Sequence, residues 1–330
     1  MAYLFDYLRI LCAISVAFYH IGIFNNFPVD LGSAVAILFA ISSFLMMTKS
    51  KEQINIQFLL KRLFRLLSLY WIITLVLFAA VKILPNIFNS MSLANEINFQ
   101  NFVKSMFLIP YYKTGSSGVL AVRPIVGPGW TLYYDVLFAI IFYLSSKINY
   151  KFRGLFVGIV LSVLIVVGLI FNINNPFAQI YLSYIWIFYL SGIAAFYVKV
   201  ILNRKTKINE LPKILLIPLI IDLILIFVVT NYFVKAALVL ILIFISSNIK
   251  TSPSPKPIMY WSSLSYSFYL IHYFIIVVFE KLFGSISIFN FKNIALSIAV
   301  ILIGYLIAII EYEILEKRLF KKVENAILKD

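Results

Sequence analysis

Charged residues are scarce in this 330-residue chain: Asp, Glu, Lys and Arg together make up 12% of it, whereas 63% of its residues are hydrophobic. So little charge cannot cover the surface of a soluble domain, and the composition predicts a polytopic membrane protein instead. The single cysteine, Cys12, excludes an intrachain disulfide. No cleavable signal sequence is expected, because the first apolar segment lacks a basic leader and a small-residue exit.

Long apolar runs dominate what is present. They predict an all-α polytopic membrane bundle that forms one domain over residues 1–330, without an internal repeat. About ten transmembrane helices are expected, at residues 4–24, 31–48, 65–84, 131–147, 154–172, 177–199, 212–230, 232–249, 261–283 and 293–315. The segment 58–65 mixes apolar and basic residues and is expected to lie on the membrane surface before the third span.

The net charge of +15 reflects membrane topology in this interpretation. Most of the 28 Lys and Arg residues fall in alternate loops and in the tail after the last span. The positive-inside rule then predicts that both termini are cytoplasmic and that the long 85–129 loop is external. The basic charge therefore does not indicate a nucleic-acid partner.

The first apolar segment carries two ionisable side chains, Arg9 and His20. Their spacing places both on one face of a helix, about 16 Å apart along its axis. Ionisable groups at membrane depth are costly and usually mark function, and a neutral imidazole can take a proton from a hydroxyl. His20 is expected near the middle of the membrane. The alternatives are a His20 bonded to a backbone carbonyl and an Arg9 that extends to the inner membrane surface.

Three further groups could carry chemistry. Arg62 and Arg65 share a helix face at i and i+3, and their guanidinium groups suit phosphate oxygens, although the spacing alone favours basic anchoring beside lipid phosphates at the membrane boundary. Asp135 lies just inside the fourth span, where it could cap the helix, contact Arg9 or contact a substrate hydroxyl. His272 shares a face with Tyr269 and either lines a cavity or bonds a neighbouring helix. No HExxH, CxxC, P-loop or GxSxG pattern supports metal, ATP-hydrolysis or α/β-hydrolase chemistry.

Six sequence elements follow one another along the chain: Phe5-Asp6-Tyr7-Leu8-Arg9 through His20, Phe39 to Phe44, Lys61 to Arg65 with Tyr70-Trp71, Gly129 to Asp135, Ser265 to His272, and Glu316-Lys317. Taken in this order, they resemble acyltransferase family 3, the integral-membrane O-acyltransferases of bacterial surface carbohydrates. The form Pro-Gly-Trp-Thr-Leu-Tyr-Tyr is most similar to the exopolysaccharide-modifying branch. Asp135 stands where the family pattern has glutamate, which shortens the reach of the carboxylate by one methylene.

The resemblance implies transfer of an acyl group, with acetyl expected, from acyl-CoA to a hydroxyl of an exported polysaccharide at the cell (cytoplasmic) membrane. It implies no metal, and the acceptor is a carbohydrate, free or lipid-linked. The rival hypothesis is a non-enzymatic transporter, such as a flippase of lipid-linked glycans. The implied roles are a base or acyl carrier for His20; charge stabilisation for Arg9; orientation for Asp135; donor-phosphate binding for Arg62 and Arg65; and acceptor binding for Trp130, Tyr134, Tyr269 and His272.

Overall fold

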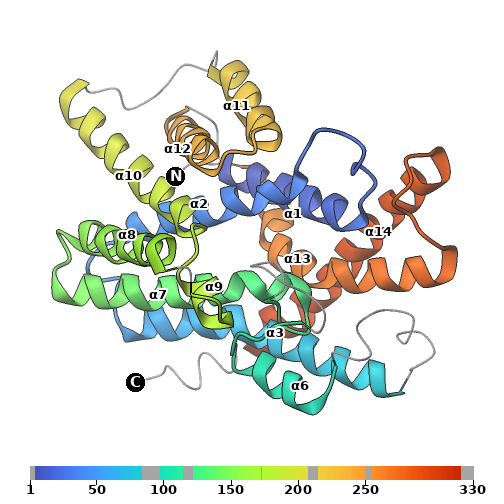
Figure 1. Ribbon diagram of the computed structural model, residues 1–330. Helices are drawn as coiled ribbons and strands as arrows, with labels where there is room; N and C mark the ends of the chain where they lie inside the picture. The colour runs from blue at the N-terminus through green and yellow to red at the C-terminus, as the bar shows by residue number, and fades with distance from the viewer. Residues whose placement is uncertain are drawn as a thin grey trace. The chain divides into compact units, whose positions relative to one another are not determined.

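The computed structural model describes residues 4–83, 97–113, 122–171, 173–206, 215–249 and 254–320. Over these residues the named secondary-structure elements are all helices, joined by turns and irregular segments, and Tyr112 forms an isolated antiparallel β-bridge with Val122 (Figure 1). The all-α prediction is therefore confirmed. The helices group into two compact units. The first contains residues 1–50, 185–266 and 287–294, and the second contains residues 51–184, 267–286 and 295–330.

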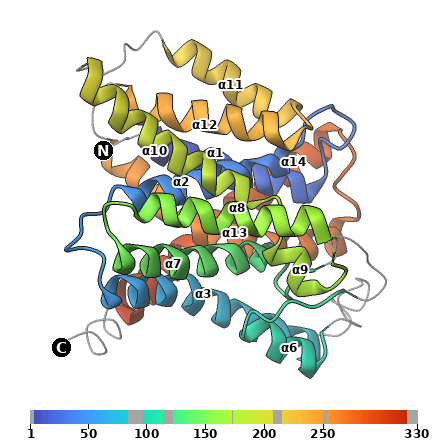
Figure 2. The ribbon, with the colours of Figure 1, turned by 60° about the vertical axis from the view of Figure 1, so that its left-hand side comes forward.

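The first unit is built around helices α2 and α10, which pack against each other and both against α12. Helix α11 lies along α12, as both ribbon views show (Figures 1 and 2). The unit also contains the first part of α13 (Lys256–Phe283) and of α14 (Phe291–Glu311). Its other elements are α1 (Leu4–Ile21), the short 3₁₀ turn η1 (Leu31–Ser33), α2 (Ala34–Met47), α10 (Trp186–Thr206), α11 (Leu216–Val228) and α12 (Tyr232–Asn248).

Small residues bring α2 and α10 close together. A Cβ on Gly192 would lie 2.1 Å from the Ser43 hydroxyl oxygen and 2.2 Å from the Ala40 carbonyl oxygen, so only glycine fits there. The Ser43 hydroxyl donates a hydrogen bond to the Tyr189 carbonyl across the interface, at 2.9 Å. The rings of Phe39 and Tyr189 stack at 4.7 Å. Close packing of small residues is how apolar helices associate in a membrane.

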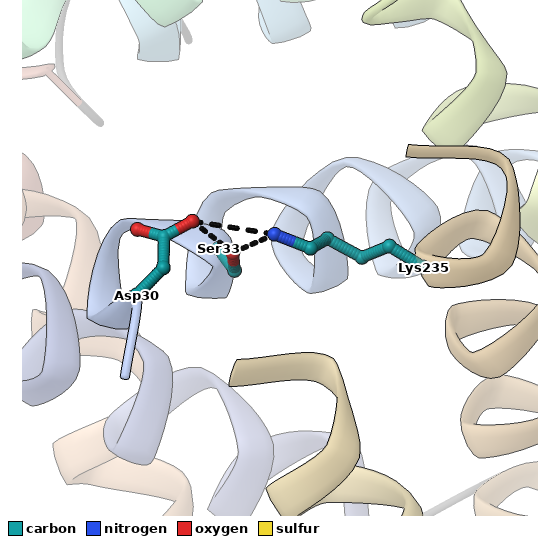
Figure 3. A network of polar contacts seen from close by, with 3 residues as sticks. All are labelled: Asp30, Ser33 and Lys235. Atoms are coloured by element: carbon teal, nitrogen blue, oxygen red, sulfur yellow. Dashed lines mark hydrogen bonds and ion pairs between the residues drawn. The ribbon is translucent and has the colours of Figure 1, made fainter. Parts of the chain in front are cut away.

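A buried lysine joins the 22–33 connection to α12 in the same unit. The Lys235 ammonium group contacts the Asp30 carboxylate at 3.2 Å and also the Ser33 hydroxyl (Figure 3). The Ser33 hydroxyl in turn donates a hydrogen bond to Asp30. The Lys235 side chain is 4% exposed, whereas that of Asp30 is 51% exposed. The ammonium group of Lys235 is therefore buried, whereas the carboxylate of Asp30 that pairs with it still reaches solvent.

The second unit is built on α3 and α7, which pack side by side, with α8 against α7 and α6 against α3 (Figure 2). It also includes the remaining parts of α13 and α14. Its other elements are α3 (Ile56–Ile83), α6 (Phe99–Met106), the 3₁₀ turn η3 (Gly127–Gly129), α7 (Trp130–Ile148), α8 (Arg153–Phe171), α9 (Pro176–Tyr181) and the π-helical segment η5 (Tyr312–Phe320).

Helix α3 corrects one expectation. Residues 58–65 do not form a separate surface helix, because α3 runs without a break from Ile56 to Ile83. Its 28 residues span about 42 Å, which exceeds the roughly 30 Å thickness of the hydrocarbon core. The basic first turns are thus the start of a long helix. The sequence of α3 contains neither Gly nor Pro, so no residue interrupts the helix between its basic first turns and its apolar part.

Among the described residues, seven helical segments are long and apolar enough to cross a membrane, compared with the ten predicted. The other three predicted spans coincide with the shorter apolar helices Leu31–Met47, Leu216–Val228 and Tyr232–Asn248. Helices of this length rise only about 20–26 Å. A hydropathy profile depends only on how many apolar residues a segment contains, so it does not show where each helix ends. The seven candidate spans are Leu4–Ile21, Ile56–Ile83, Gly127–Ile148, Arg153–Phe171, Pro176–Leu202, Lys256–Phe283 and Phe291–Leu315. Of these, Pro176–Leu202 joins α9 to α10 through a short turn.

Candidate active site

A Pro-Gly corner at the start of α7 organises the candidate site of the second unit. Its backbone approaches α3 so closely that a Cβ on Gly129 would lie 2.6 Å from the ring of Tyr70. From α13, the Tyr269 hydroxyl donates a hydrogen bond to the Pro128 carbonyl at 3.2 Å, and the Thr131 hydroxyl donates to the same carbonyl, also at 3.2 Å. The corner is therefore fixed between two helices, and it sets where the first turns of α7 begin.

Asp135 lies on the second turn of α7, too far along the helix to cap it. No side chain caps the first turn, where Gly129 is the N-cap residue. The Asp135 carboxylate instead pairs with Arg62 of α3, with Nη2 and Oδ1 3.9 Å apart. The two side chains are 25% and 19% exposed, so the pair is only partly screened by solvent. The sequence had given Arg62 and Asp135 separate roles, and the fold brings them together.

Arg62 and Arg65 do not share one environment. Arg62 is partly buried beside α7, whereas Arg65, one turn later on α3, is exposed. Residues at i and i+3 lie about 60° apart around a helix, which is enough for one to reach a neighbouring helix while the other faces outward. Of the two guanidinium groups, Arg65 is therefore the more accessible to a bulky phosphate group.

Three of the four residues expected to bind the acceptor are buried in this structure. Tyr134 and His272 are fully buried and Tyr269 is 6% exposed, whereas Trp130 is partly exposed. The ring of Trp130 meets that of Tyr134 edge-on at 5.8 Å. The His272 Nδ1 atom lies 3.3 Å from the Phe268 carbonyl oxygen, a hydrogen bond within α13. Within the second unit, Trp130 is therefore the most accessible of the four.

Arg9 and His20 lie on α1 of the first unit, and both are partly exposed. His20 is not in the middle of a membrane span, because α1 ends at Ile21. Gly22 ends the helix: its φ of 77° is left-handed, and its amide donates to the carbonyls of Phe18 and Tyr19. Apolar residues after the glycine had hidden this end in the sequence. His20 therefore lies in the last turn, where its ring meets Tyr19 edge-on at 5.3 Å.

Residues 3–312 match the family model described as an acyltransferase domain. The chain belongs to the acyltransferase 3 family. The match covers nearly the whole chain and spans both units, and it makes this protein a multi-pass membrane acyltransferase. No curated protein and no solved structure matches the chain.

The structure also gives the Tyr70-Trp71 element of this acyltransferase a physical role that the sequence did not indicate. The Tyr70 hydroxyl donates to the Ser105 carbonyl at 2.9 Å, and the Trp71 indole donates to the Met106 carbonyl at 2.7 Å. The Ser105 hydroxyl accepts a hydrogen bond from the Ile125 amide at 2.9 Å. These bonds tie the end of α6 to α3 and tie Ile125 to the end of α6. No sequence pattern marked Ser105, because its partners lie 20 and 35 residues away.

Among the described residues, no three His, Cys, Asp or Glu side chains gather as the ligands of a metal ion would. Among its described residues, the second unit instead brings together guanidinium, carboxylate and phenol groups. As chemical types, guanidinium groups bind anions, whereas carboxylates and phenols exchange hydrogen bonds with hydroxyl groups.

Proposed function

We propose that this acyltransferase moves an acyl group, with acetyl expected, from acyl-CoA to a hydroxyl of an exported polysaccharide. The observation that carries the proposal is the family match over residues 3–312, combined with the ordered elements from Arg9 to His272 that resemble the carbohydrate-modifying members. In the reaction the thioester C–S bond breaks and a C–O ester bond forms. The hydroxyl proton is transferred by way of the enzyme to the thiolate of coenzyme A.

His20 is the proposed proton acceptor. An imidazole that is neutral near pH 7 can take the hydroxyl proton as the ester bond forms. It could alternatively accept the acyl group first and pass it to the hydroxyl. The two routes are distinguished by incubating the enzyme with acyl-CoA alone, since only the second leaves an acyl group on His20, which mass spectrometry detects. Arg9 on the same helix is proposed to stabilise the negative charge that develops.

Arg62 and Arg65 are proposed to hold the donor phosphates, because guanidinium groups bind phosphate oxygens in a bidentate way. The 3.9 Å contact of Arg62 with Asp135 supports a refinement in which the carboxylate holds the Arg62 group in position. The exposed Arg65 is then the first to meet the donor. Replacing both arginines by lysine should weaken coenzyme A binding and leave abundance normal, because membrane insertion treats the two cations alike. Unchanged affinity would reduce the pair to membrane anchors.

The central test compares His20→Gln with His272→Gln in purified protein, following the release of coenzyme A and the acylation of a polysaccharide. Loss of a positioned base costs about 10²–10⁴-fold in rate, so His20→Gln should lose at least about a hundredfold. His272 is fully buried, so His272→Gln should lower the melting temperature. The transfer rate of each folded His272→Gln molecule should fall much less than that of His20→Gln. Near-normal transfer by the His20 variant would overturn the mechanism. A wild-type protein that turns over no acyl-CoA with any acceptor would favour the transporter.

We further propose that both termini face the cytoplasm and that the protein resides in the cell membrane. The uneven distribution of Lys and Arg between alternate loops supports this orientation. A test uses Gly115→Cys, at a position outside the described residues, in a background with Cys12→Ala. The new thiol should react with an impermeant reagent from outside the cell. Labelling only from the cytoplasmic side would reverse the orientation and the direction of acyl transfer.

A further inference from the structure

Arg123 is a partly buried cation that has no counter-ion among the described residues. It directly precedes Pro124, in the segment that leads into the corner at the start of α7. The side chain is partly buried, and its Nε atom is inaccessible to solvent and has no hydrogen-bond partner among the described residues. No carboxylate in the described parts of the chain forms an ion pair with it. Leaving a buried guanidinium nitrogen unsatisfied is costly, so the site needs a partner.

The neighbours of Arg123 belong to the candidate active site. Arg123 and Asp135 are both close enough to the Tyr269 hydroxyl to act on it electrostatically. Asp135 in turn pairs with Arg62. Among the described residues, the charged groups that these interactions connect are two guanidinium groups and one carboxylate, all within the second unit. The carboxylate balances one cation, and one positive charge remains.

We infer that Arg123 binds an oxyanion of one of the two substrates, which completes the charge balance of this site. The guanidinium fork matches a carboxylate or a phosphate, and an anion that enters a partly desolvated site gains more from this contact than it would in water. Two sources carry such a group: the phosphates of the acyl-CoA donor, and an acidic group on the carbohydrate acceptor. This inference rests on the proposed acyl-transfer function and narrows its substrates to those that present an oxyanion beside Tyr269.

The test measures binding to detergent-purified full-length protein with defined probes. Coenzyme A reports the donor, and D-glucuronate compared with D-glucose reports an acidic acceptor. The variants are Arg123→Gln and Arg123→Lys, with Lys82→Gln as the control. Lys82 is exposed in the same unit, so the control removes the same charge away from the site. All measurements use the monodisperse folded fraction, and Arg123→Lys provides the comparison if the glutamine variant does not fold.

We expect Arg123→Gln to weaken binding of one probe at least about tenfold and Lys82→Gln to leave it unchanged. Arg123→Lys should fall between wild type and Arg123→Gln, because a point charge loses the bidentate contact. Weaker coenzyme A binding assigns the oxyanion to the donor. Loss of the preference for glucuronate over glucose assigns it to the acceptor. Wild-type binding of all three probes by both variants would overturn the inference.

These outcomes stay distinct from failure of the proposed function. A protein that binds an oxyanion through Arg123 but transfers no acyl group would uphold the inference and refute the enzyme. A protein that transfers acyl groups and binds every probe equally well with and without Arg123 would refute the inference and uphold the enzyme.

Discussion

The contact between α2 and α10 allows a prediction whose size can be worked out from the structure. In Gly192→Ala the new methyl group would lie 2.2 Å from the Ala40 carbonyl oxygen, whereas ordinary contact begins at 3.4 Å. The two backbones must therefore separate by about 1 Å. This separation would break the hydrogen bond from Ser43 to the Tyr189 carbonyl and disturb the stacking of Phe39 on Tyr189.

Overpacking of this kind costs about 1–3 kcal/mol, and a hydrogen bond between membrane helices contributes up to about 1.7 kcal/mol. A total loss of about 2–4 kcal/mol is therefore expected for Gly192→Ala, which should lower the melting temperature by several degrees. The measurement is thermal unfolding of the purified protein in detergent, followed by the loss of the monodisperse peak in size-exclusion chromatography.

Two controls sharpen this experiment. In Gly127→Ala the new methyl group would meet only a ring carbon of Tyr273 at 3.9 Å, so the same substitution should leave the melting temperature near that of wild type. Adding Ser43→Ala to Gly192→Ala removes the hydroxyl but leaves the Ala40 carbonyl in the way, so it should not restore stability. A melting temperature for Gly192→Ala equal to that of wild type would refute the close approach of the two helices.

Two further predictions concern the other close contacts. Gly129→Ala should lower both the melting temperature and the rate of acyl transfer, because its methyl group would lie 2.6 Å from the fully buried Tyr70 ring. If Gly127→Ala and Gly129→Ala had equal melting temperatures and equal turnover, the close packing of the corner against Tyr70 would be refuted. Asp30→Ala should destabilise the protein more than Lys235→Met, because it leaves a buried ammonium group without its carboxylate, whereas the half-exposed Asp30 can rehydrate. The opposite order of melting temperatures would contradict the pairing.

Much of the architecture follows from local sequence. The apolar runs identify the helices, because both helix formation and transfer into a bilayer depend on consecutive residues. All ten predicted spans coincide with apolar helices, although three of these are short. Where helices end was less predictable. Gly22 ends α1 just after His20, and an apolar run that continues past a glycine does not show such an end in a hydropathy count.

The candidate site divides in the same way. The motifs named Arg62, Asp135 and Tyr269 from the sequence alone, since each residue type stands in a recognisable local pattern. Only the tertiary structure could join Arg62 to Asp135, or place Arg123 near the Tyr269 hydroxyl, because these residues are far apart along the chain. Sequence fixes which side chains are available and where helices can form, whereas ion pairs and unbalanced charges depend on the path of the chain between them.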